Sequence, residues 1–369
     1  MRRDSLIALF VITLFLPACA NAFYKVIDLG TLGTIYGLRS GAYCINNSGQ
    51  IVGWAESGFG MHATLFDPTS QGKNVDLGTL GGTISVANSI SNGGQIVGAS
   101  DNSSGYWHAT LFDPSGRGNN IDLGTLDGRE SIAYSINDIG RIVGCATIRL
   151  VPDHATLFNR RPGANNIDLG TLGGTDSAAY SINNSSQIVG RAHRPSGGPH
   201  ATLFDPTGQG NNIDLGTIGD LFSEARSINE SGQIVGRVFD TWGNARATLF
   251  DSTGQGNNID LGTLGGKSSE AQSINDNGQI VGWSLISSGG TRATLFDPTG
   301  AGDNINLNTL IDPACGWTLV FANSINNNGW IVGQGRNPAG QEHAYLLIPE
   351  PGTVVLLGLG ILALRKRKQ

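Results

Sequence analysis

Residues 179–216 read AYSINNSSQIVGRAHRPSGGPHATLFDPTGQGNNIDLG, and four short runs in this segment have the composition of β-strands. The runs contain SIN, QIVG, ATLF and NIDLG, and they are rich in Ile, Val, Thr, Leu and Phe. Asn, Gly, Asp and Pro separate them, as the turns between strands require. We therefore expect strands a, b, c and d over 179–183, 187–190 with a residue or two beyond, 201–204 and 212–216.

This unit occurs seven times in the chain. The first two starts of the DLGTL segment that ends strand d are 48 residues apart, and all later starts are 46 residues apart. Four short strands every 46 residues predict an all-β protein, a seven-bladed β-propeller with four-stranded blades. A β-solenoid or stacked array is the alternative. The seven starts are Asp28, Asp76, Asp122, Asp168, Asp214, Asp260 and Asn306.

The two ends of the repeat region complement each other. The region begins with a lone strand d at 24–29 and stops after a strand c at 343–348 that has no d of its own. Pairing these two segments would complete the seventh blade, and the closed ring would leave no long unpaired sheet edge. An open solenoid would instead need polar caps on its end repeats. We therefore expect a propeller that is closed by its N-terminal strand.

The N-terminus has the features of a secretory signal peptide. Two arginines precede an apolar run at 6–16, and Ala20 and Ala22 fit the small-x-small cleavage pattern. We expect signal peptidase to remove residues 1–22. The alternatives are a membrane anchor, for which the run is too short, and lipoprotein processing at Cys19.

A three-part segment ends the chain. It consists of a short motif, an apolar run and a basic end, namely Pro349, Glu350 and Pro351, residues 353–364, and Arg365, Lys366 and Arg367. This order resembles the PEP-CTERM sorting signal, the substrate tag of exosortases in Gram-negative bacteria. The resemblance implies that residues 349–369 hold the precursor transiently in the inner membrane as a short transmembrane helix until exosortase cleaves the tail. The alternative is a hydrophobic tail that happens to end in basic residues.

The expected mature protein, residues 23–348, is acidic. Loss of both end segments removes six positive and two negative residues and changes the formal charge from −6 to −10. Such a protein is repelled by nucleic acid, so no nucleic-acid partner is expected. The spacing of Cys44, Cys145 and Cys315 fits neither a disulfide ladder nor a metal site, so we expect free thiols or one incidental bridge.

We interpret the repeated polar residues as structural. The His that opens strand c would be spread around the circumference of a ring, so its copies cannot converge on one substrate atom. We predict instead a hydrogen bond that stabilises each blade, to the strand-a Ser or the strand-d Asp. The loop at 205–214 resembles a calcium loop but lacks the alternating acidic residues. No cofactor, metal or catalytic residue is predicted. The copies are His62, His108, His154, His200 and His343.

The HATLF segment and the preceding GQIVG resemble the HAF family of extracellular repeats over roughly residues 24–347. The resemblance implies export and a repeat fold and supplies no known activity. Arg246, Arg292 and the HAYLL copy at His343 depart from the pattern, so the His cannot be essential in every blade.

The connections that differ between repeats are expected on one face. The a–b and c–d turns repeat closely, whereas the b–c loops and d–a connections vary, and an antiparallel blade places these two kinds of connection at the same end. Aromatic and arginine side chains gather in them, which predicts a ligand-binding surface. The alternative is that these loops vary because nothing constrains them. The predicted residues are Trp54, Tyr106, Trp107, Arg149, Arg191, Arg194, Phe239, Trp242, Trp283 and Trp317.

These features together predict a non-catalytic protein of the cell surface or extracellular matrix that binds exopolysaccharide or another surface protein. One alternative is a propeller glycosidase or polysaccharide lyase, for which Glu224 and Glu270, just before strand a, are thin support. A purely structural matrix component is the other.

Overall fold

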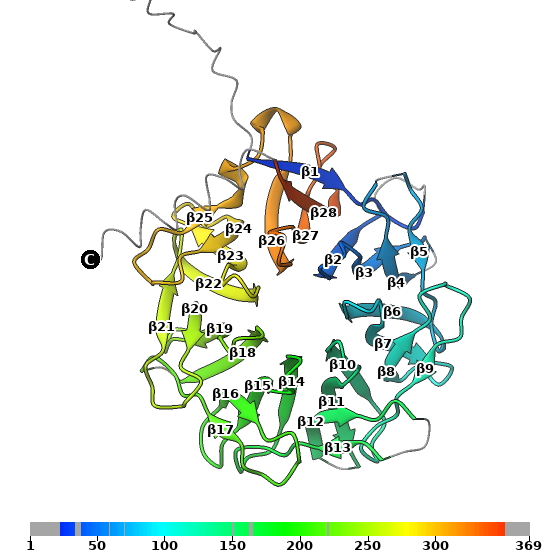
Figure 1. Cartoon of the computed structure of the whole chain (residues 1–369), viewed down its shortest axis with the longest axis vertical. Helices are drawn as coiled ribbons and strands as arrows, with labels where there is room; N and C mark the ends of the chain where they lie inside the picture. Colours follow the sequence, from blue (N-terminus) through cyan, green and yellow to red (C-terminus); the bar gives the residue numbers. More distant parts are fainter. Residues whose placement is uncertain are drawn as a thin grey trace, which may run out of the picture.

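The computed structural model describes residues 23–33, 38–58, 60–69, 71–149, 151–161, 165–219 and 221–350. Strands β1 to β28 form seven antiparallel sheets of four strands, arranged as blades around a central axis (Figure 1). The prediction of an all-β, seven-bladed propeller is thereby confirmed. The expected signal peptide and the apolar and basic parts of the sorting tail lie outside the described residues.

Strands a to d of each blade run from the axis outward. Blade 1 contains β2 (Ser40–Ile45), β3 (Ile51–Glu56), β4 (Met61–Phe66) and β5 (Val75–Asp76); blade 2 contains β6 (Gly81–Ile90), β7 (Ile96–Asn102), β8 (Trp107–Phe112) and β9 (Ile121–Asp122). Blade 3 contains β10 (Ser131–Ile136), β11 (Ile142–Ile148), β12 (Val151–Phe158) and β13 (Ile167–Asp168); blade 4 contains β14 (Ser177–Ile182), β15 (Ile188–His193), β16 (Pro199–Phe204) and β17 (Ile213–Asp214).

Blade 5 contains β18 (Phe222–Ile228), β19 (Ile234–Phe239), β20 (Ala245–Phe250) and β21 (Ile259–Gly262); blade 6 contains β22 (Gly265–Ile274), β23 (Ile280–Ile286), β24 (Thr291–Phe296) and β25 (Ile305–Asn306). Blade 7 contains β26 (Thr318–Ile325), β27 (Ile331–Arg336), β28 (Glu342–Pro349) and β1 (Tyr24–Asp28). Two short 3₁₀ helices, η1 (Leu307–Thr309) and η2 (Pro313–Cys315), lie in the long connection that leads into blade 7.

The N-terminal strand closes the ring. Strand β1 pairs antiparallel with β28, and the register runs from Tyr24 opposite Pro349 to Asp28 opposite Tyr345. The N–H of Tyr24 also donates to the carbonyl oxygen of Leu310 on the neighbouring connection (3.0 Å). The two ends of the repeat region therefore share one sheet, as their complementary sequences predict.

Strand d is shorter than its sequence suggests. In blade 4 the expected strand at 212–216 is reduced to Ile213–Asp214. The side chain of Asn212 accepts from the N–H of Asp205 (2.8 Å) and donates to the carbonyl of Leu169 in blade 3 (2.9 Å). This residue therefore links two blades instead of extending the strand.

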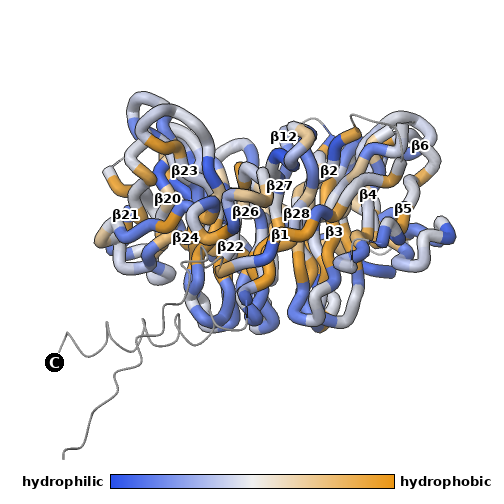
Figure 2. The backbone as a smooth tube through the Cα atoms, turned by 90° about the horizontal axis from the view of Figure 1, so that it is seen from above, coloured by the Kyte–Doolittle hydropathy of each residue, from blue (hydrophilic) through white to orange (hydrophobic). Residues whose placement is uncertain are grey.

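The hydrophobic core lies between neighbouring blades. One cluster, for example, joins Val143 and Leu169 of blade 3 to Ile188 and Phe204 of blade 4. Within each blade the Gly of QIVG lies against the irregularity in strand a: a Cβ on Gly190 would overlap the carbonyl oxygen of Ala178 in the same sheet. In the side view of Figure 2, apolar segments occupy the middle of the disc and the turns at its lower edge are hydrophilic.

The a–b turns tie the blades together around the axis. The side-chain amide of the Asn in SIN donates to the next blade, as Asn183 does to the carbonyl of Asn229 (3.1 Å). A second set of hydrogen bonds between the a–b turns forms a closed circle around the axis. In each blade, a backbone N–H donates to a side-chain oxygen of the next blade. The members of this circle are Asn47, Asn92, Asp138, Asn184, Glu230, Asp276 and Asn327, which returns to Asn47. These side chains line a central cavity of about 200 Å³.

The two faces of the disc differ in kind. We call the end with the b–c and d–a connections the variable face and the end with the a–b and c–d turns the repeated face. Both ends of the described chain lie at the repeated face, where the N–H of Glu350 donates to the carbonyl of Phe23 (2.9 Å). Pro349 also lies beside Gly329 in the a–b turn of blade 7. Glu350, the last described residue, therefore lies at the face opposite the variable face.

Candidate functional site

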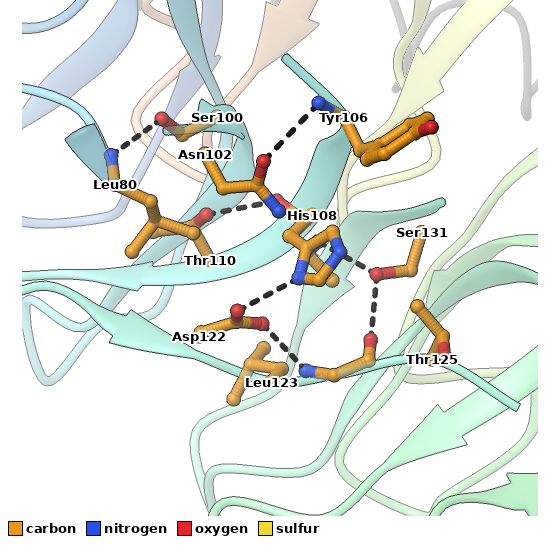
Figure 3. Close-up of polar contacts among 12 residues, drawn as sticks. Leu80, Ser100, Asn102, Tyr106, His108, Thr110, Asp122, Leu123, Thr125 and Ser131 are labelled. Carbon is orange, nitrogen blue, oxygen red and sulfur yellow. Dashed lines mark hydrogen bonds and ion pairs between the residues drawn. The ribbon is translucent and has the colours of Figure 1, made fainter. Parts of the chain in front are cut away.

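The repeated His pairs with the strand-d Asp of its own blade. In blade 2, His108 Nδ1 lies 2.7 Å from Asp122 Oδ2 (Figure 3). Its Nε2 lies 3.1 Å from the carbonyl oxygen of Arg129. Both ring nitrogens face acceptors, and the hydrogen bond with Asp122 raises the pKa of His108. Burial of Asp122 opposes its ionisation, but the bonds from His108 and Gly124 outweigh it and lower its pKa.

A serine at the start of strand a completes this interblade network. Ser131 of blade 3 accepts from the N–H of Ala109 in blade 2 (2.9 Å) and donates to the carbonyl of Gly124 (2.6 Å). The predicted blade-stabilising role of the His is confirmed, with the strand-d Asp as its partner. The serine bonds to backbone instead. These repeated polar groups are therefore occupied in holding the fold together.

The ten residues predicted for the binding surface are spread over the blades and do not form one cluster. Trp242 is 87% exposed, whereas Trp54 is 9% exposed and its indole packs against Gly41. Arg149 is exposed, and the other seven are partly buried. Trp54, Arg191 and Trp283 lie in the residue or two by which strand b was expected to continue, and Trp107 begins strand c, so these four side chains come from strands and not from loops.

Several of these side chains contact aromatic rings or guanidinium groups locally. The guanidinium of Arg129 lies over the Tyr106 ring, 5.6 Å from its centroid, and that of Arg237 lies 4.6 Å from the centroid of Phe239. Trp283 contacts Phe321 edge to face, with ring centroids 6.4 Å apart. Such contacts fix the side chains that the variable face presents.

A network of charges that the sequence did not predict lies on the inner strands of blades 4, 5 and 6. We call it the funnel cluster; it comprises Tyr180, Arg191, Glu224, Arg226, Arg237 and Glu270. Arg237 bonds to Glu224 (2.8 Å) and to Glu270 (2.6 Å), and Arg226 bonds to the same two carboxylates (both 2.9 Å). Arg191 donates to the hydroxyl of Tyr180 (2.9 Å).

The electrostatics of the funnel cluster favour fixed charges. Burial opposes ionisation of Glu224, but Arg226 and Arg237 outweigh it and hold its pKa below the ordinary value. Burial raises the pKa of Tyr180, over whose ring Arg226 lies at 4.7 Å. A carboxylate in this state is a poor proton donor, so the cluster is better suited to orienting polar groups than to acid catalysis.

The sequence does carry a signal for this cluster. The residue before SIN varies between repeats although its neighbours repeat, and in blades 4 and 5 it is Tyr180 and Arg226. Its side chain reaches the neighbouring blade, as Asn88 shows by donating to the carbonyl of Ala133 (2.9 Å). A comparison of the seven repeats at each position would have identified this variable position as a signal for the funnel cluster.

A cleft opens on the variable face between blades 6 and 7. It has a volume of about 500 Å³. Its lining comes from the starts of β24, β26 and β28 and the end of β27: Gly290, Thr291, Arg292, Thr318, Val320, Phe321, Gln334, Gly335, Arg336 and Glu342. The preceding d–a connection, residues 307–317, contains η1 and η2.

The remaining candidate chemistry is limited. Cys44, Cys145 and Cys315 are free thiols, and burial raises the pKa of Cys145 to about 12, so this thiol is protonated and unreactive. No group of His, Cys, Asp or Glu within the described ranges is placed to hold a metal ion. In the same part of the chain, no helix has the length and apolar character needed to cross a membrane.

Residues 347–368 match the PEP-CTERM protein-sorting motif. The motif implies export as a surface protein, with a membrane-anchored precursor that exosortase processes. A search of curated proteins with the whole sequence found no match.

Proposed function

Because the chain ends in a sorting motif for surface export, we propose that it is a non-catalytic surface protein that binds a glycan or another protein through its variable face. The observation that carries the proposal is the placement of the chain ends. The bond between Glu350 and Phe23 lies at the repeated face, so in the membrane-held precursor, before exosortase removes the tail, the variable face is directed away from the membrane. Exposed loops on a rigid scaffold are a common place for recognition.

The distribution of side chains supports the same assignment. Repeated residues are used in bonds within and between blades, as the His–Asp pairs and the ring of a–b turns illustrate. Exposed or partly exposed aromatic and arginine side chains, such as Trp242, Tyr106 and Arg149, occur in the connections that do not repeat. The proposal has two further parts: the repeats are similar to HAF repeats, and the host is a Gram-negative bacterium.

The funnel cluster bears on the alternative of a glycosidase or lyase. Such an enzyme needs a carboxylic acid that can hold a proton near neutral pH. Glu224 and Glu270 are each bound by two arginines, and the pKa of Glu224 is lowered, which favours permanent anions. This arrangement supports a binding role over acid catalysis at that position.

The test is binding by the purified full chain to a glycan array and to surface proteins of the host. A variant with Trp107, Trp242 and Trp283 changed to Ala should lose most binding. Ile139→Ala, which removes an exposed apolar side chain from the repeated face, should retain it. Thermal melts establish that both variants fold. Equal binding by the triple variant and the wild type would discard the variable face as the site.

A further inference from the structure

The interface between blades 6 and 7 lacks the repeated contacts that the strand-c His, the strand-d Asp and the strand-a Ser make elsewhere. Arg292 stands where five repeats have His, Asn306 replaces the strand-d Asp, and Leu319 replaces the strand-a Ser. Asn306 instead caps η1 by accepting from the N–H of Asn308 (3.0 Å). Leu319 is fully buried and offers no hydroxyl group to blade 6. The three positions that carry the repeated network have therefore all changed at one interface.

The cleft on the variable face lies at this same interface. Arg292 enters it from blade 6, and Arg336 and Phe321 enter it from blade 7. Where Arg246 of blade 5 replaces the His, it bonds to Asp260 (2.7 Å), but Arg292 has only an asparagine in that place. Among the described residues, the one hydrogen bond of the Arg292 guanidinium group is to the carbonyl of Thr291 (2.8 Å).

Arg336 also departs from its counterparts in other blades. In blades 1, 2 and 3 the equivalent side chain accepts a hydrogen bond from the backbone near the start of strand a, as Asp101 does from the N–H of Ile84 (2.8 Å) and Thr147 from that of Arg129 (2.8 Å). A guanidinium has no acceptor and cannot take this role. Within the part of the chain that the structure describes, Arg336 is exposed and forms no ion pair. The cleft therefore contains two arginines without carboxylate partners, against one acidic residue, Glu342.

We propose that this cleft binds the carboxylate of a uronic-acid residue in an acidic oligosaccharide, an inference that rests on the proposed binding function of the variable face. A guanidinium group matches a planar carboxylate with two parallel hydrogen bonds. Phe321, held edge to face by Trp283, supplies an apolar surface for a sugar ring. A volume of about 500 Å³ suits a few sugar units.

The neutral lining favours a sugar over an acidic peptide. Thr291, Thr318 and Gln334 supply hydroxyl and amide groups, which suit the hydroxyls of a saccharide. An acidic peptide of the same length brings about the same negative charge toward Glu342 but has no hydroxyl groups to pair with these side chains, so the lining and not the net charge favours the sugar.

The experiment measures binding of trigalacturonate to the purified full chain by titration calorimetry, with maltotriose as the neutral sugar and triglutamate as the acidic peptide. Trigalacturonate should bind more tightly than either, and its affinity should fall as salt rises. Arg292→Gln and Arg336→Gln should each weaken binding about tenfold to a hundredfold. Arg292→Lys should also weaken it, because one ammonium cannot form the paired hydrogen bonds.

The matched control is Arg117→Gln, which removes the same charge from an exposed position in the c–d turn of blade 2, on the repeated face. It should bind trigalacturonate as the wild type does. Failure of the wild type to bind trigalacturonate, tighter binding of triglutamate, or equal binding by folded Arg292→Gln and Arg336→Gln variants would each overturn the cleft proposal. The proposed function would fail separately, in the array experiment with the triple tryptophan variant.

Discussion

Replacing Ser85 by Ala tests the network that joins the blades. Ser85 is fully buried, accepts from the N–H of Ala63 (2.9 Å) and donates to the carbonyl of Gly78 (2.6 Å). The substitution leaves the N–H of Ala63 buried without a partner, which costs about 1–3 kcal/mol. A folded region of about 330 residues unfolds with an entropy of about 0.7 kcal/mol/K, so a loss of about 2 kcal/mol lowers the Tm by about 3 °C.

The assay is a thermal melt followed by circular dichroism, with Ser48→Ala as the control. Ser48 is exposed in an a–b turn, and its replacement should leave the Tm unchanged. An equal Tm for Ser85→Ala and Ser48→Ala would refute the argument that the strand-a serines hold neighbouring blades together.

Three further predictions concern other parts of the ring. His154→Gln should lower the Tm most between about pH 4 and 6.5. The bond with Asp168 raises the pKa of His154 above 6.5, so its contribution is full below pH 6.5 and is lost as the pH rises through the raised value; Asp168, whose pKa lies below 3.8, loses its contribution as the pH falls through that lowered value. Glu270→Gln should destabilise the fold by about 3 kcal/mol in urea unfolding, because it leaves the partly buried Arg226 and Arg237 to share the one carboxylate of Glu224; a change below about 0.5 kcal/mol would contradict this. Ser186→Gly should raise the stability by about 0.5 kcal/mol, since Ser186 alone among the a–b turns has a positive φ (64°) without being glycine, and a lower stability would argue against strain there.

The sequence predicted the fold well because the repeat reports strand order and number directly. Seven copies of four runs define the blades, and the incomplete repeats at the two ends predict the pairing of β1 with β28. Strand ends were predicted less well. Strand d stops after Asp214 because its carboxylate accepts from the N–H of Gly216 (2.7 Å), whose positive φ (70°) turns the chain out of the sheet. Strand b continues to His193, one residue past its expected end.

The candidate site was predicted only in outline. Sequence variation located the variable face, but it could not show that Trp54 is buried while Trp242 is exposed. The funnel cluster depends on side chains of different blades that meet across the interface, such as Arg237 and Glu270. The cleft likewise depends on what is missing between two blades, and the change from Asp to Asn306 becomes informative only beside Arg292.

Ring closure is the central claim, because the separation of the two faces depends on it. Lys25 lies opposite Ile348 in the register of β1 and β28, so cysteines at these positions should form a disulfide under mild oxidation. Mass spectrometry of the digested protein should then find the peptides around residues 25 and 348 joined. Cysteines at Lys25 and Glu342, which lies beyond the end of β1, should remain unlinked. No linkage between positions 25 and 348 in folded protein, or equal linkage in the control, would contradict the closed ring.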